Sequence, residues 1–395
     1  MRVDKTKWEY LPLEDIATVL NGYAFRSDNY SPNGIRIVRI TNVQDGFIED
    51  SDPKFYPIST EKEIRRYLLH ENDLLISLTG NVGRVGLLKN SFLPAALNQR
   101  VGCIRLKEHK NNLKFLYYQL RQNSFKEDCI NYSKGVAQLN MSTEWLKAYK
   151  ILIPSIAEQQ AIASELDAIQ TMIDGYKAQL EDLDTLAQSI FLDMFGNVSM
   201  NDKSWNIIPM GKLGDFKNGL NYNKGEQGKS IKIIGVGNFQ NIKSLSSFND
   251  ISSIEVEYIS EEYLLHNEDI VFVHSNGNKN LVGRCLEVYP NDTEVTFSGF
   301  CIRFRKSVEI SNRYLIALLT DSGFKKTHLL KSNGIGIQNI NQKLLSSLPI
   351  PVPSVDLQKL FAAKVEAIEQ QKELIKSQLA DAETLMAERM QYYFS

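Results

Sequence analysis

Two long stretches of the chain carry apolar side chains at alternating spacings of four and three residues. This spacing puts them on one seam of a helix and is typical of a coiled coil. Each stretch follows a proline-bearing segment and spans about 35 residues, or about 50 Å. The predicted seam consists of Ile162, Leu166, Ile169, Ile173, Tyr176, Leu180, Leu183 and Ile190 in the first helix, and Phe361, Val365, Ile368, Ile375, Leu379 and Met386 in the second.

Short apolar runs fill the rest of the chain and predict strands, because Gly, Asn and Pro bound them. Two further segments, 113–121 and 313–321, are predicted to be helical. The fold class is therefore α+β, with mixed α/β domains alternating with long helices. The predicted strands lie at 35–40, 74–78, 101–106, 231–236, 269–274 and 300–305.

The second half of the chain repeats the first at a distance of about 200 residues. Trp8 reappears as Trp205, and segment 67–73 matches segment 263–269. We also align Cys103-Ile-Arg105 with Cys301-Ile-Arg303. The chain is thus a tandem duplication of one domain plus one long helix. The expected boundaries are 1–153 for the first domain, 154–197 for the first helical spacer, 198–352 for the second domain and 353–395 for the second spacer.

The exposed seam of a lone long helix would be unfavourable, so the two helices are expected to pair. An antiparallel coiled coil with pseudo-two-fold symmetry would give the helices of both copies equivalent packing. The alternative, in which each helix packs only on its own domain, remains open from the helix pattern alone.

Composition adds constraints on the class of protein. The 395 residues include 45 Lys+Arg, 47 Asp+Glu and 43% hydrophobic residues, the balance of a soluble globular chain. No run is long and apolar enough to span a bilayer, so we expect a cytoplasmic protein without a membrane partner. The four cysteines are far apart and are expected to be buried thiols. Residues 1–150 carry 22 basic and 17 acidic groups, whereas residues 151–200 carry 1 and 8.

The sequence contains no complete catalytic motif. Gly228-Lys229-Ser230 resembles the end of a phosphate loop, but Asn223 occupies the position of the required first glycine. The five histidines lack the spacing of metal ligands, and His70 and His266 are expected to be structural. The sequence therefore predicts no catalytic residue, no metal site and no bound cofactor.

Polar, glycine-rich loops recur instead at equivalent positions of the two copies. Arg suits guanine and Asn or Gln suits adenine, while lysines hold phosphates; the alternative is that these are ordinary turns. The copies differ most in these loops, as expected if each half presents a different surface. The candidate DNA-binding residues are Asn21, Thr79, Asn81, Arg84, Asn98, Gln99, Arg100, Lys134, Gln138 and Asn140 in the first copy, and His274, Asn276, Asn278, Lys279, Arg284, Lys331, Asn333 and Gln338 in the second.

This layout resembles the specificity subunit of type I restriction-modification systems over the whole chain. The matching motifs are Trp8-x-x-x-Pro12-Leu13, Leu74-Leu-Ile-Ser77 with Gly80 and Gly83, Asn98-Gln99, Ile153-Pro154 through Ile162, and Phe191 through Gly196. The second copy departs in places, with Asp356-Leu357-Gln358 where the first has Glu158-Gln159.

The resemblance implies a non-catalytic subunit that binds double-stranded DNA and reads a split target, one domain per half-site. Its implied partners are two methyltransferase subunits that methylate adenine N6, and restriction or translocase subunits where the system has them. S-adenosylmethionine, ATP and Mg²⁺ are then expected on those partners.

Two other classes of function remain open: a coiled-coil scaffold that binds no DNA, and a nuclease or methyltransferase with an unrecognised active site. A variant of the leading hypothesis is the specificity subunit of a related system whose partner fuses methylation and cleavage.

Overall fold

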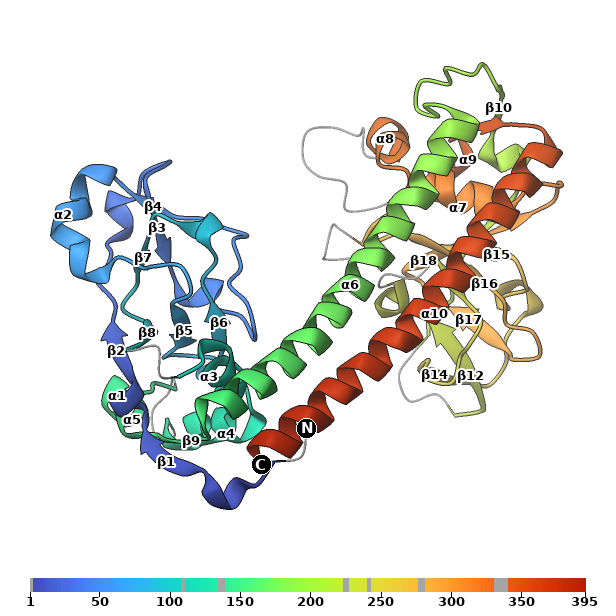
Figure 1. The fold of residues 1–395 in the computed structure, drawn as a ribbon. Helices are drawn as coiled ribbons and strands as arrows, with labels where there is room; N and C mark the ends of the chain where they lie inside the picture. The colour runs from blue at the N-terminus through green and yellow to red at the C-terminus, as the bar shows by residue number, and fades with distance from the viewer. Residues whose placement is uncertain are drawn as a thin grey trace. The chain divides into compact units, whose positions relative to one another are not determined.

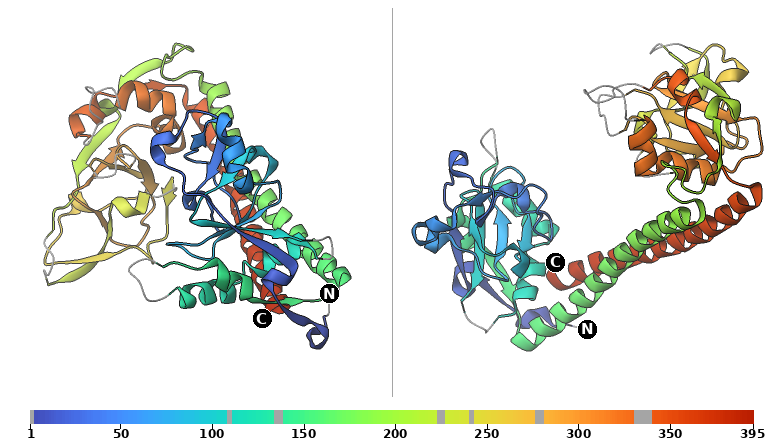
Figure 2. Two further views of the ribbon diagram at one scale, coloured as in Figure 1. Left: turned by 90° about the vertical axis from the view of Figure 1, so that its left-hand side faces the viewer. Right: turned by 90° about the horizontal axis from the view of Figure 1, so that it is seen from above.

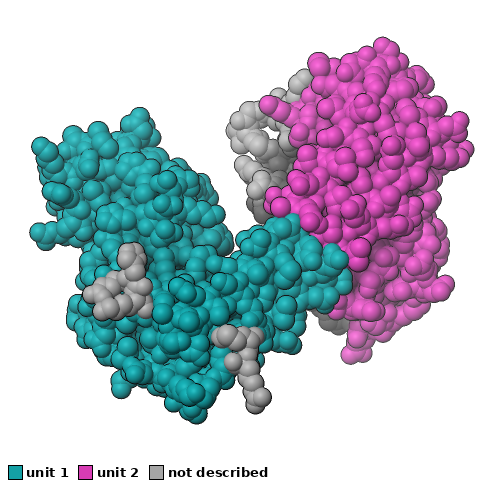
Figure 3. All heavy atoms as spheres, viewed as in Figure 1, with its two compact units in different colours: residues 1–177, 376–395 teal, residues 178–375 magenta. Residues whose placement is uncertain are grey.

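The computed structural model describes residues 3–107, 111–133, 139–222, 227–239, 243–275, 281–329 and 340–395. The chain forms two compact units, coloured separately in Figure 3. Unit 1 comprises residues 1–177 and 376–395, and unit 2 comprises residues 178–375. Each unit therefore combines a mixed α/β domain with one segment from each of two long helices.

The strands described in unit 1 form a four-stranded antiparallel sheet of order β2-β8-β5-β6 and a mixed three-stranded sheet of order β4-β3-β7, while β1 pairs with β9 (Figure 1). The run 74–77 is apolar on both faces because Leu74 and Ile76 join one core cluster and Leu75 joins another. The bounds are β1 Glu9–Pro12, β2 Ala17–Asn21, β3 Ile35–Val38, β4 Phe55–Tyr56, β5 Leu74–Ser77, β6 Val85–Leu87, β7 Ala95–Leu97, β8 Val101–Leu106 and β9 Lys150–Ile153.

Unit 2 repeats this plan with one additional strand. Its larger sheet has the order β11-β18-β15-β16-β13 and its smaller sheet the order β14-β12-β17, while β10 pairs with β19. The predicted strands of both copies are confirmed to within about two residues. The bounds are β10 Asn206–Pro209, β11 Gly214–Asn218, β12 Lys229–Ile234, β13 Ser244–Leu245, β14 Ser253–Val256, β15 Asp269–Val273, β16 Cys285–Val288, β17 Val295–Phe297, β18 Cys301–Lys306 and β19 Pro349–Val352.

Short helices cover these sheets, and both predicted ones are present. Asn112 and Ser311 cap α3 and α7 by accepting hydrogen bonds from backbone N–H groups of the first turn. The α-helices are α1 Leu13–Ile16, α2 Glu61–Ile64, α3 Leu113–Gln119, α4 Asn123–Tyr132, α5 Thr143–Ala148, α6 Ile156–Phe195, α7 Asn312–Thr320, α8 Ser322–Phe324, α9 Gln342–Ser346 and α10 Val355–Phe394.

The long helices α6 and α10 have 40 residues each and begin six residues before the first predicted seam position. Polar capping explains the earlier start of α6. The side chains of Ser155 and Glu158 hydrogen-bond each other and each other's backbone N–H groups, as in a capping box. At the other end, α6 stops before Gly196, whose φ of +74° favours glycine.

A buried glutamine joins the start of each long helix to its domain. Gln159 donates to the carbonyl of Pro154 at 2.9 Å and accepts from the N–H of Asn112 at 2.8 Å. Gln358 makes the same two bonds, to Pro353 and from Ser311, each at 2.9 Å. Both glutamine side chains are buried, so these bonds fix the helix where it leaves the domain.

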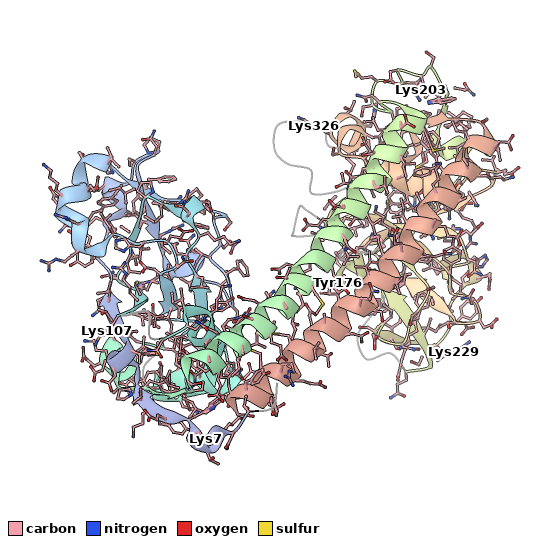
Figure 4. The ribbon with its side chains drawn as sticks, in the orientation of Figure 1. Lys7, Lys107, Tyr176, Lys203, Lys229 and Lys326 are labelled. Carbon is pink, nitrogen blue, oxygen red and sulfur yellow. The ribbon has the colours of Figure 1, made fainter. Side chains whose placement is uncertain are left out.

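In unit 1, the start of α6 and the end of α10 lie side by side (Figures 1 and 2). Ile169 and Ile173 pack against Ala382, and Lys177 forms an ion pair with Glu383. Tyr176, labelled in Figure 4, belongs to the same cluster. The start of α6 also joins the core of its own domain, so packing between helices and packing on the domain occur together.

In unit 2, the other two segments pack in the same way. Lys372 of α10 forms a 3.0 Å ion pair with Asp184 of α6, and the ring of Phe361 lies 5.6 Å from that of Phe191. Residue numbers rise along α6 as they fall along α10, so these segments are antiparallel. Every predicted seam residue is buried or half-buried.

The strand register corrects one part of the repeat alignment. Ser77 of β5 pairs with Val101 of β8, and its counterpart Val273 of β15 pairs with Cys301 of β18. Val101 is therefore equivalent to Cys301, and the alignment of Cys103 with Cys301 is wrong by two residues. The misalignment came from three identical residues, Cys-Ile-Arg, whereas the true register depends on which residues pair across the sheet.

The corrected register makes Arg105 equivalent to Arg305. Arg105 forms a two-pronged ion pair with buried Asp73, with N···O distances of 2.7 and 2.6 Å. Arg305 does the same with buried Asp269, at 2.8 and 2.7 Å. The hydrogen bonds that Arg105 and Arg305 donate to Asp73 and Asp269 raise the pKa of both guanidinium groups.

The cysteines are free and buried, as predicted. Burial raises the pKa of the Cys285 and Cys301 thiols to about 12. Within the ranges that the structure describes, no helix has the length and apolarity needed to cross a membrane.

Candidate nucleic-acid interface

The turn between β7 and β8 brings three candidate residues together, namely Asn98, Gln99 and Arg100. Main-chain bonds hold the turn: the N–H of Gln99 donates to Tyr23 O at 2.9 Å, and the N–H of Val101 donates to Asn98 O at 2.9 Å. The side chains of Gln99 and Arg100 are exposed. The rigid backbone and exposed polar groups suit recognition of an external ligand.

A hollow of about 250 Å³ lies beside this turn, lined by Arg39, Ile40, Thr41, Asn98, Gln99 and Arg100. Arg39 is half-buried and forms a 3.0 Å ion pair with Asp52, while its buried Nε has no hydrogen-bond partner among the described residues. The hollow thus has two arginines at its rim. Arg39, which directly follows β3, was not among the residues predicted from the sequence.

Arg84 lies directly before β6 and forms hydrogen bonds within its own domain. Its Nη1 donates to Gln44 Oε1 at 2.9 Å, and its backbone N–H donates to Ser77 Oγ at 3.0 Å. Nearby, Thr79 Oγ1 is buried without a hydrogen-bond partner among the described residues, whereas Asn81 is exposed. Gln44 was missed because it lies 40 positions away in the sequence.

Arg284 and His274 are the described candidates of the second domain, and both contact its backbone. Arg284 Nη1 donates to Phe239 O at 3.1 Å, and His274 Nε2 lies 2.7 Å from Gly299 O. Both side chains are half-buried. These contacts fix neighbouring loops and leave only part of each side chain accessible.

Of the remaining candidates, two lie in the described part of the chain and the others lie outside it. Asn21 ends β2 with an exposed side chain, and exposed Asn140 forms a backbone bridge with Thr79. Outside the described residues lie Lys134, Gln138, Asn276, Asn278, Lys279, Lys331, Asn333 and Gln338.

The two histidines that were predicted to be structural each donate a backbone hydrogen bond to a buried aspartate. The N–H of His70 donates to Asp73 Oδ2 at 2.8 Å, and the N–H of His266 donates to Asp269 Oδ2 at 2.7 Å. The described part of the chain contains no group of three or more His, Cys, Asp or Glu side chains placed to hold a metal ion.

Comparison with protein families identifies the class to which this duplicated fold belongs. The profile of the type I restriction modification DNA specificity domain matches twice, at residues 5–183 and 202–384. The chain therefore belongs to the family of type I restriction-modification specificity subunits, with two tandem specificity domains.

Individual relatives agree with this assignment. The specificity subunit of the type I restriction enzyme StySPI from Salmonella potsdam is 24% identical over 95% of this chain and 85% of its own length. That of EcoKI from Escherichia coli K12 is 22% identical over the same shares of the two chains. The MjaVIII specificity subunit from Methanocaldococcus jannaschii is 28% identical over 46% of this chain and 44% of its own length.

Solved structures show the same fold. The S subunit of a type I restriction-modification system from M. genitalium superposes with a TM-score of 0.56 at 17% identity, covering 99% of this chain and 97% of that one. A chain from a study of complex assembly and conformational transition of the type I R-M system gives a TM-score of 0.57 at 15% identity, covering 98% and 97%.

Proposed function

We propose that this chain is the non-catalytic, sequence-reading subunit of a type I restriction-modification complex and recognises a two-part DNA target. Each domain reads one half-site through loops that include the turn at 98–100 and its counterpart at 298–300. The observation that carries the proposal is a duplicated scaffold with matching backbone frames and different exposed side chains at these turns. One scaffold with two surfaces is the arrangement that reading two different short sequences requires.

The long helices are proposed to form one antiparallel coiled coil with pseudo-two-fold symmetry that sets the spacing between half-sites. The equivalent packing of one helix start and one helix end in each unit supports this. A 40-residue helix is about 60 Å long, while half-sites one turn apart are separated by about 34 Å. Two segments then recognise DNA, namely 1–153 and 198–352. The other two, 154–197 and 353–395, form the helical spacers.

The partners proposed are double-stranded DNA, two methyltransferase subunits and, where the system has them, restriction subunits. The acidic excess of residues 151–200 suits protein partners better than phosphate. S-adenosylmethionine, ATP and Mg²⁺ are assigned to the partners, and the site of action is the cytoplasm.

A base-resolution map of adenine methylation in the host genome, with and without this gene, tests the proposal. We expect one split motif to lose methylation when the gene is deleted and to regain it on complementation. Identical maps together with a purified complex that methylates DNA without this chain would contradict the proposal. Retention of the motif in a strain lacking the restriction gene alone serves as the control.

A further inference from the structure

The turns at 98–100 and 298–300 have the same backbone frame. In the corrected register, Asn98, Gln99 and Arg100 are equivalent to Ser298, Gly299 and Phe300. The N–H of residue 99 donates to Tyr23 O at 2.9 Å, and that of residue 299 donates to Leu220 O at 2.8 Å. A second hydrogen bond is also the same in both turns. The N–H of Val101 donates to Asn98 O at 2.9 Å, and the N–H of Cys301 donates to Ser298 O at 2.8 Å.

Neighbouring elements fix both turns in the same way. The carbonyl of Arg100 accepts from the N–H of Leu78 at 3.0 Å, and the carbonyl of Phe300 accepts from the N–H of His274 at 2.9 Å. A glycine approaches each turn so closely that a Cβ on Gly22 would lie 2.1 Å from Asn98 O. On Gly219 a Cβ would lie 2.0 Å from Ser298 O.

Although the backbones of the two turns match, the side chains at residues 100 and 300 differ in chemical type. The guanidinium group of Arg100 is exposed and makes no hydrogen bond or ion pair with any residue that the structure describes, whereas the backbone N–H of Arg100 donates to Asn98 Oδ1 at 3.3 Å. Phe300 at the equivalent position is 61% exposed, and its ring contacts no other aromatic side chain among the described residues. The exposed ring, held by a turn whose backbone is fixed by hydrogen bonds, is therefore available for contact with an external partner.

The residue beside the turn also differs in charge between the two domains, and again the first domain carries the positive charge. Arg39 follows β3 and lines the hollow next to Arg100, and its N–H donates to Asn42 Oδ1 at 2.9 Å. Its counterpart is Gly235, whose N–H donates to Asn238 Oδ1 at 2.8 Å. The first domain therefore presents two arginines where the second presents a glycine and a phenylalanine.

We propose that residues 100 and 300 are equivalent base-reading positions with different specificity: Arg100 donates to the O6 and N7 acceptors of a guanine, and Phe300 packs against the 5-methyl group of a thymine. Guanine offers two acceptors that a guanidinium spans, and the thymine methyl is the apolar group of the major groove. This inference rests on the proposed function and names the bases that two of its residues select.

The test uses the complete complex with its methyltransferase partner, on duplexes of the target defined by the methylation map. Replacing each guanine in turn with 7-deazaguanine removes only the N7 acceptor, and replacing each thymine with deoxyuridine removes only the methyl group. We expect one 7-deazaguanine position to lower methylation by about tenfold for the wild-type chain but not for Arg100→Ala. One deoxyuridine position in the other half-site should lower methylation severalfold for the wild type but not for Phe300→Ala.

Matched substitutions elsewhere separate base reading from general effects. Arg66→Ala removes an exposed arginine, and Tyr258→Ala removes an aromatic ring that is 83% exposed. Both variants should keep wild-type sensitivity to the modified bases, while Arg100→Lys should weaken the guanine preference despite keeping its charge, because lysine lacks the planar fork of arginine.

Different outcomes of this experiment contradict the roles of Arg100 and Phe300 and the proposed function. If Arg100→Ala remains as sensitive to every 7-deazaguanine as the wild type, the role of Arg100 is wrong. If no deoxyuridine affects the wild type, or if Phe300→Ala keeps the same sensitivity, the role of Phe300 is wrong. A complex whose methylation follows no split target overturns the proposed function itself.

Discussion

The ring of Phe195, at the end of α6, lies 4.7 Å from the ring of Tyr314 in the core of the second domain. The repeat reproduces this contact in unit 1, where Phe394 at the end of α10 lies 5.3 Å from Phe115. Each domain core is thus completed by the final turn of the long helix that the other copy supplies. Segments distant in sequence therefore contribute to the stability of each domain.

Phe195→Ala should destabilise unit 2 by about 3–5 kcal/mol, because the side chain is fully buried and the substitution leaves a cavity. Denaturant unfolding followed by near-ultraviolet circular dichroism measures the change. Leu192→Ala, three residues earlier at a side chain that is 58% exposed, is the control and should cost less than about 1 kcal/mol. Equal effects of the two substitutions would contradict the proposed role of the contact.

Asp269→Ala should cost about 3–5 kcal/mol, because it leaves Arg305 without its buried partner. Asp73→Ala should have a similar effect in unit 1 through Arg105. Thermal unfolding of each variant provides the measurement, with exposed Asp292→Ala as a control expected within about 0.5 kcal/mol of wild type. A wild-type transition for Asp269→Ala would show that the ion pair does not support the fold.

The pair formed by Glu165 and Arg389 should make the packing between α6 and α10 sensitive to acid. Burial alone would raise the pKa of Glu165, but hydrogen bonds from Arg389 and Tyr393 lower it from 4.5 to about 2. A lowered folded-state pKa gives stability that is fully present above the unfolded pKa and is lost as pH falls towards the folded value.

Glu165→Gln removes this pH-dependent contribution. The difference in unfolding free energy between wild type and Glu165→Gln should therefore be constant above about pH 5 and should shrink between about pH 4.5 and 2. Urea titrations at several pH values measure it, and exposed Glu181→Gln is the control. A difference that grows on acidification would have the wrong sign.

Arg84→Ala and Arg284→Ala should weaken DNA binding by the assembled complex while leaving assembly intact. If each arginine contacts a phosphate, the slope of log affinity against log salt should fall by about one for each substitution. Gln44→Ala is a useful control because it removes the hydrogen-bond partner of Arg84 but no charge. Unchanged affinity and slope for both arginine variants would remove them from the interface.

The sequence alone determined the duplication, the α+β class and the two long helices. These follow from local patterns: a four-three apolar spacing defines a helix seam whatever it packs against, and recurring motifs define a repeat. The apolar run at 74–78 likewise predicted a strand, and the structure then showed that this strand is buried on both faces.

Only the tertiary structure decided the register of β18, and with it the equivalence of Arg105 to Arg305 and of Arg100 to Phe300. Strand pairing depends on partners far away in the chain, so a two-residue error leaves the local apolar pattern almost unchanged. The contacts of Arg84 with Gln44 and of Phe195 with Tyr314 were hidden for the same reason. Such contacts arise when the folded backbone brings distant segments together, and no local spacing encodes them.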